Sequence, residues 1–172
     1  SVEILKPIEI DTTTFEEISI NAEQIEVNKK YNSAFSKSNI EDQIQKSPIN
    51  LMVEWNNQNF LKLGNENKLI INILDASIKK TEIMNVGAKK YEERTLFNYE
   101  LFYLVEYNLY DSSDYLLANT TVETSRSTTS QKYISLNETE IIINDLLISA
   151  MRDYINETKN QLSIYMGDYL SF

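Results

Sequence analysis

The clearest pattern of hydrophobic and polar positions lies in residues 96–129, where side chains alternate along two stretches. A period of two is typical of β-strands, so this region predicts two strands. The polar DSSD sequence at 111–114 predicts the turn between them, and the second strand becomes polar in its later half. The alternation of the first strand places on one face Tyr99, Leu101, Tyr103, Val105, Tyr107 and Leu109.

A third strand is expected at 68–83, where a continuous apolar run is followed by alternation. The Asn-Val-Gly sequence at 85–87 predicts the turn that follows it. Residues 15–28 also look extended, but their apolar positions change phase near Glu23 and Gln24, which predicts a bulge or kink. The polar residues 31–46 lack strong periodicity, so we expect a mobile surface segment there.

Two helices are expected. The first begins with Ser47 as N-cap and Pro48 at the first helical position, and Gly64 predicts its end. Its apolar face would carry Ile49, Met52, Val53, Phe60 and Leu63, widened by Leu51 and Trp55. The second would begin at the NETE sequence of 137–140, which resembles a capping box, and run to about residue 162.

These elements predict an α+β fold in which two helices pack on one face of a mostly antiparallel sheet of about four strands. The length of 172 residues is enough for one domain with its own core. We therefore expect a single α+β domain over 1–172, with 1–14 as an extended N-terminal segment.

The amino-acid composition and net charge exclude several kinds of functional site and partner. The chain has no His and no Cys, so it lacks the usual neutral-pH proton shuttle and thiol nucleophile, and we predict no metal site and no cofactor. The formal net charge of −10 would repel phosphate backbones, so nucleic acid is not an expected partner. The same charge disfavours direct docking on anionic lipids, and no run is long enough for a transmembrane helix.

Asp75 is the strongest candidate for catalysis, because it interrupts an apolar strand and burial could raise the pKa of its carboxyl group. The simpler interpretation is that it lies where the strand meets water or pairs with a cation. Glu100 and Glu106 are six residues apart on one strand, too far to share one ion, so we expect both to be solvated or at a rim of the sheet.

Tyr99, Tyr103 and Tyr107 share one strand face and, together with Trp55, are candidates for lining a ligand groove between sheet and helices. Packing in the core is the interpretation that the sequence favours. Arg126 and Arg152 are candidate polar anchors, since a guanidinium group can hold a carboxylate of this chain or of a partner.

Two blocks resemble known proteins. Residues 47–83, with a Pro-initiated helix, a central Trp and the strand sequence ILDAS, resemble a group of alphaproteobacterial predicted lipoproteins of unknown function. Residues 99–127 and 137–162 resemble the strand–turn–strand–Arg–helix layout of small periplasmic lipoproteins, which include the lipopolysaccharide-assembly lipoprotein LptE and auxiliary lipoproteins of ABC-type lipid transporters. Those families are non-enzymatic partners of transport and envelope-assembly machines, so the resemblance implies a kind of role and no site residues.

The leading hypothesis is therefore a non-catalytic periplasmic lipoprotein that binds an envelope protein complex or a lipid-like ligand. Its membrane attachment would be only an N-terminal lipid, with the signal peptide and lipidated Cys upstream of Ser1. One alternative is a cytosolic or secreted effector-like interaction module that uses 31–46 and the polar TSRSTTSQK segment as contacts. The other is an enzyme that uses Asp75 and a distant Glu.

Overall fold

The computed structural model describes residues 9–33 and 37–171, and its main layer is a four-stranded sheet with strand order β2-β4-β5-β6. The strands are β2 (Gln24–Lys29), β4 (Lys68–Met84), β5 (Thr95–Tyr110) and β6 (Leu116–Ser130). β4, β5 and β6 form an antiparallel meander, whereas β2 pairs with β4 in parallel. The predicted α+β class and the three long strands are confirmed, and the sheet is mixed rather than purely antiparallel.

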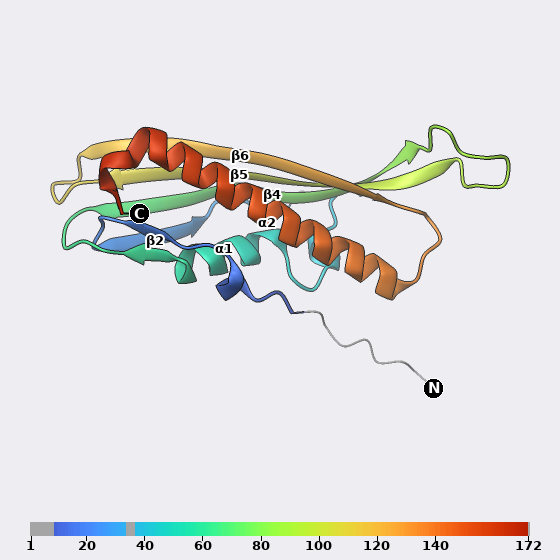
Figure 1. Ribbon diagram of the computed structural model, residues 1–172, viewed down its shortest axis with the longest axis horizontal. Helices are drawn as coiled ribbons and strands as arrows, with labels where there is room; N and C mark the ends of the chain where they lie inside the picture. The colour runs from blue at the N-terminus through green and yellow to red at the C-terminus, as the bar shows by residue number, and fades with distance from the viewer. Residues whose placement is uncertain (1–8, 34–36, 172) are drawn as a thin grey trace.

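Both helices lie on the same face of this sheet, as expected (Figure 1). α1 (Pro48–Gln58) packs on β2 and β4, and α2 (Leu136–Met166) crosses β5 and β6. The sheet face beneath them is the one that the alternation of β5 predicted, and its residues from Tyr99 to Leu109 are at most 1% exposed. The hairpin between β4 and β5 extends past the helices, and Gly87 at its tip has φ 89°, which only glycine adopts readily (Figure 1).

A second, small sheet has the order β3-β1-β7. Its strands are β1 (Ile18–Ile20), β3 (Phe60–Lys62) and β7 (Leu170–Ser171). The phase change predicted near Glu23 and Gln24 corresponds to the passage of the chain from β1 in this sheet to β2 in the main one. Three short 3-10 helices complete the described part: η1 (Thr12–Thr14), η2 (Glu41–Gln43) and η3 (Gly167–Tyr169). Of the predicted extended segment 1–14, residues 1–8 lie outside the described residues and the last three form η1.

The first helix is shorter than its pattern predicted. It ends at Gln58, with Asn59 as C-cap, because Phe60 pairs with Ile18 in the small sheet. The Asn59 side chain donates to the carbonyl oxygens of Thr12 at 3.0 Å and Phe15 at 2.8 Å. Leu63 is 59% exposed and belongs to no helix face, so that assignment was wrong.

Gly64 does not end the helix. A Cβ atom at this position would lie 1.9 Å from the Asn21 side-chain oxygen and 3.0 Å from the Ala22 nitrogen. Glycine is therefore needed for the close approach of two chain segments. The second helix also starts earlier than predicted: Ser135 is its N-cap, and its hydroxyl accepts from the Glu138 N–H at 3.1 Å.

The segment predicted to be mobile at 31–46 contains a buried carboxylate. Glu41 is 5% exposed and accepts hydrogen bonds from the Tyr31 hydroxyl, the Asn39 amide, the Ser33 hydroxyl and the Ile78 backbone N–H. Burial alone would raise the pKa of Glu41, but these hydrogen bonds outweigh it and lower the pKa. Glu41 thus fixes residues 39–43 against the edge of β4 beyond the end of β2.

Candidate functional site

The four aromatic residues predicted to line a ligand groove form the centre of the core instead. Trp55, Tyr103 and Tyr107 are 0% exposed and Tyr99 is 1% exposed. The rings of Trp55 and Tyr154 make an edge contact with centroids 6.0 Å apart. The described residues cover all four side chains, so the core interpretation that the sequence favoured describes their position.

Their polar atoms are paired with other parts of the fold. The Trp55 indole N–H donates to the Glu16 carbonyl at 3.0 Å, and the Tyr103 hydroxyl donates to the Pro48 carbonyl at 3.0 Å. The Tyr107 hydroxyl is hydrogen-bonded to Tyr154 and donates to the Asn56 side chain. Desolvation raises the pKa of Tyr103, Tyr107 and Tyr154. These hydroxyls therefore stay neutral and hold the helices on the sheet.

Asp75 follows an irregularity in β4, where the register with β5 shifts between Ile73 and Asp75. It is half-buried, and its Oδ1 atom is buried without a hydrogen-bond partner among the described residues. Burial is the main cause that raises the pKa of Tyr31, whose hydroxyl donates to Glu41, and the nearby Glu41 and Asp75 carboxyl groups add to it. Asp75 therefore lies near the Glu41 cluster, and it pairs with Leu104, which follows Tyr103 on β5 and points to the opposite face of the sheet.

The two predicted arginine anchors differ. Arg126 Nη1 lies 3.0 Å from Asp153 Oδ2 and 3.3 Å from Oδ1, so it pairs with a carboxylate of this chain. Arg152 is exposed and makes no ion pair within residues 9–33 and 37–171. It borders a shallow hollow of about 210 Å³ together with Thr14, Phe15, Glu16, Ile155 and Asn156.

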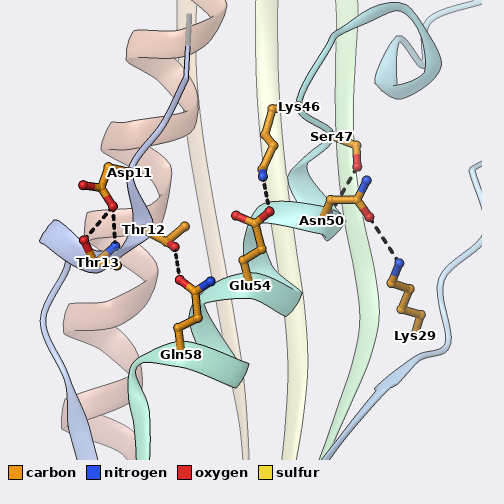
Figure 2. Close-up of polar contacts among 9 residues, drawn as sticks. All are labelled: Asp11, Thr12, Thr13, Lys29, Lys46, Ser47, Asn50, Glu54 and Gln58. Atoms are coloured by element: carbon orange, nitrogen blue, oxygen red, sulfur yellow. Dashed lines mark hydrogen bonds and ion pairs between the residues drawn. The ribbon is translucent and has the colours of Figure 1, made fainter.

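The candidate functional site lies on the helical side, around the Gln45–Lys46 segment that leads into α1. The solvent face of α1 there is polar: Asn50, Glu54 and Gln58 follow one another at intervals of four residues (Figure 2). Lys46 Nζ pairs with Glu54, and Lys29 Nζ donates to the Asn50 oxygen at 3.2 Å. These contacts engage both cations that border α1 in Figure 2 with groups of the same chain.

Gln45 and Lys46 line a hollow on each side. One is open and polar, about 560 Å³, and is bordered by residues 9–13 and by Glu54 and Gln58 of α1. At its edge Thr12 donates to Gln58 at 2.5 Å, and the Asp11 carboxylate accepts from the Thr13 N–H at 3.0 Å (Figure 2). The Thr13 hydrogen bonds lower the pKa of Asp11.

The other hollow, which we call the Glu140 cavity, is about 220 Å³ and separates residues 43–46 from the first three turns of α2. Ile44, Leu136, Ile143 and Leu147 make its apolar walls. The Oε2 atom of Glu140 is buried and has no hydrogen-bond partner among the described residues. The polar remainder of the lining is Gln43, Gln45, Lys46, Thr139 and Asn144.

The Glu140 cavity was not predicted from the sequence, although the half of it that α2 forms has a recognisable sequence pattern. Glu140, Ile143 and Leu147 are spaced by three and four residues, so an acid lies on the buried stripe of the second helix. The segment that faces this stripe, residues 43–46, carries no periodicity from which its position could be inferred.

The opposite face of the main sheet carries a polar row that crosses all four strands: Asn28, Asn72, Glu106 and Thr121 occupy consecutive register positions. Asn28 donates to Asn72 at 3.1 Å and Asn72 to Glu106 at 3.0 Å. Asn108 donates to the same Glu106 oxygen at 2.8 Å. These amides lower the pKa of Glu106, so its charge is held within the row. Glu106 was expected to be solvated or at a rim, and it is half-buried.

The described residues contain neither a membrane-spanning helix nor a cluster of metal ligands. In residues 9–33 and 37–171, no helix is both long and apolar enough to cross a membrane. Across the same residues, no three acidic side chains are grouped closely enough to hold a metal ion.

Comparison with known proteins finds similarity of layout among solved structures. The sequence matches no protein-family model and no curated protein. Among solved structures, the chain is similar to a minor lipoprotein from Acinetobacter baumannii, with a TM-score of 0.43 and 14% sequence identity over 84% of this chain and 93% of that chain. A TM-score of this size reflects a general similarity of layout and carries no argument about function.

Proposed function

We propose that this chain is a non-catalytic domain of the envelope-lipoprotein kind that binds a protein partner, in the periplasm, as part of envelope transport or assembly. The observation that carries the binding role is the Glu140 cavity, where apolar walls lie beside a carboxylate whose buried Oε2 atom has no hydrogen-bond partner among the described residues. Leu136, on the wall of this cavity, is 76% exposed. Apolar side chains beside unsatisfied polar groups are typical of surfaces that a partner covers.

Several features support binding rather than catalysis. The chain has no His and no Cys, and its buried tyrosine hydroxyls are engaged in packing the helices on the sheet. Asp75, the one catalytic candidate, lies on β4 near Glu41, whose lowered pKa keeps the Glu41 carboxylate charged. Neither group faces the Glu140 cavity.

The binding role is testable by site-specific photocrosslinking in the source cells. A photoreactive phenylalanine analogue at Leu136 would lie on the cavity wall, and the same analogue at Val86, which is 94% exposed at the β4–β5 hairpin, provides the matched control. We expect a discrete protein adduct from position 136 and none from position 86. Equal labelling at both positions, or none at 136, would contradict a partner site on the helical side.

The envelope location rests on the resemblance of residues 47–83, 99–127 and 137–162 to periplasmic lipoproteins. Its test is to fractionate the source cells and measure the mass of the native N-terminal peptide. An acylated cysteine upstream of Ser1 in the membrane fraction is the expected result. An unmodified N-terminus in the cytosolic fraction would refute the location and favour an effector-like interaction module with the same binding surface.

A further inference from the structure

The Glu140 cavity contains a carboxylate group that no donor of the described lining satisfies. The Oε2 atom of Glu140 is buried and has no hydrogen-bond partner among the described residues. A carboxylate oxygen removed from water without a donor is unfavourable, so native proteins rarely leave one unpaired. Lys46 is the one cation among the described residues of the lining, and it directs its Nζ atom to Glu54 (Figure 2).

From these contacts we infer that the Glu140 cavity receives a basic side chain and a neighbouring aliphatic side chain from a segment of a partner protein. The inference rests on the proposed partner-binding function and specifies its chemistry. The carboxylate would accept the charge-assisted hydrogen bond of a lysine or arginine of the partner. Leu136, Ile143 and Leu147 would pack against the aliphatic group.

The size of the cavity favours side chains over a whole small molecule. Its volume is about 220 Å³. Pockets that enclose drug-sized ligands or cofactors are typically about 300–1,000 Å³. One or two side chains presented by a protein segment are the better match, and the rest of that segment would lie over the exposed Leu136.

The charge of the molecule favours a basic partner as well. Sixteen Lys and Arg residues oppose twenty-six Asp and Glu residues, so the formal net charge is −10. A field of this sign attracts a cationic segment and repels an anionic one, and it increases the association rate at low salt. On α2, Glu138 is exposed two residues before Glu140 and adds to the formal negative charge of this end of the helix.

The test uses two peptides of equal length and nearly equal apolar size. Acetyl-Leu-Lys-Leu-amide carries the proposed determinant, and acetyl-Leu-norleucine-Leu-amide lacks only the ammonium group. Binding to the full chain is followed by amide chemical shifts in two-dimensional NMR. We expect the lysine peptide to bind with a Kd on the order of 1 mM, to shift Ile44, Leu136 and Ile143, and to bind about tenfold more tightly than the norleucine peptide.

Two variants locate the interaction. Glu140→Gln keeps the size of the side chain and removes its charge, so it should weaken binding of the lysine peptide about tenfold and leave the norleucine peptide unaffected. Glu138→Gln is the matched control, because Glu138 is exposed on the same helix and does not line the cavity. It should change binding less than twofold, which measures the contribution of the long-range field alone.

Three results would overturn the inference: equal affinity for the two peptides, equal weakening by the two variants, or shifts confined to residues outside the cavity. Equal affinity for hexylammonium and for the lysine peptide would also overturn it. A free alkylammonium ion would then be sufficient for binding, and the neighbouring aliphatic side chain of a partner segment would contribute nothing. Failure here together with a protein adduct at position 136 would remove the basic determinant but leave the proposed function. Loss of both would remove the binding site itself.

Discussion

The hydrogen bonds to Glu41 should make a measurable contribution to stability, because they hold a buried charge in a segment that has no helix or strand pattern. Its Oε1 atom accepts from Tyr31 at 2.7 Å, Asn39 at 3.0 Å and the Ile78 N–H at 3.1 Å, and its Oε2 atom accepts from Ser33 at 3.0 Å. Glu41→Gln keeps the size of the side chain and removes its charge. Each hydrogen bond to a charged group stabilises a fold by about 1.5–3 kcal/mol, against about 1 kcal/mol for a neutral one.

A charged bond exceeds a neutral one by at most about 2 kcal/mol, so the four weakened bonds set an upper limit of about 8 kcal/mol on the loss, and the relief from burying a charge offsets much of it. The pKa of Glu41 is lowered in the folded protein, so the charged form is favoured by folding and its removal must destabilise. We expect Glu41→Gln to lower the free energy of unfolding by about 1–2 kcal/mol at neutral pH.

This loss should depend on pH in a defined direction. A lowered folded pKa gives stability that is fully present above the unfolded value of about 4.3 and is lost as the pH falls through the folded pKa. The gap between the natural protein and the variant should therefore be constant above about pH 5.5 and shrink below about pH 4. Glu106 and Asp11, whose pKa values are also lowered, remain in both proteins and cancel in the comparison.

The assay is urea unfolding at several pH values, followed by the fluorescence of Trp55, which is the single tryptophan and is buried. Glu106→Gln serves as a second reference: Glu106 also has a lowered pKa but lies on the sheet face opposite the helices, and its loss should be smaller. Equal stability of the natural protein and Glu41→Gln at neutral pH would refute the reasoning. A gap that stays constant down to about pH 3 would do so as well.

Three further outcomes are expected. Tyr154→Phe removes one hydroxyl from the bonded pair with Tyr107 and should cost about 1 kcal/mol in urea unfolding, whereas Tyr165→Phe, at a 57% exposed position, should cost nothing measurable. Asn59→Ala removes two hydrogen bonds to the N-terminal segment, so limited proteolysis within residues 9–17 should become several-fold faster. Arg126→Ala breaks a half-exposed ion pair and should cost less than about 1 kcal/mol, with no difference from the natural protein at high salt in thermal unfolding.

The meander was predictable because its signal is local. Strict alternation in β5 identified both faces of the strand before its neighbours were known, and the turns at 85–87 and 111–114 carry their own sequence signals. Asp111 illustrates this, since its side chain accepts from the N–H groups of Ser113 and Tyr115 within the same turn.

The sequence-based predictions were wrong where contacts between residues far apart in the sequence determine the structure. Phe60 continues the helical spacing of α1, but its pairing with Ile18 draws it into a strand. Glu41 lies in a segment that has the composition of a surface loop. Its burial is favourable only because of its hydrogen-bond donors, which include the N–H of Ile78. The Glu140 cavity needed the position of residues 43–46, which neither pattern nor composition indicates. Such long-range pairings leave no periodic trace in the sequence.

The small sheet has a consequence for how this chain reaches its fold. β1 pairs with β3 on one side and with β7 on the other, so residues 19 and 20 have one of their two partners at the opposite end of the described chain. The meander and α2 are contiguous in sequence and can assemble from near neighbours, whereas β1 and β2 pair only with strands made later. During synthesis, the apolar side chains of Ile18 and Ile20 emerge before either partner strand, and the small sheet stays incomplete until β7 has been made. The early part of the chain is therefore the part that most needs protection from aggregation while the remainder is being made.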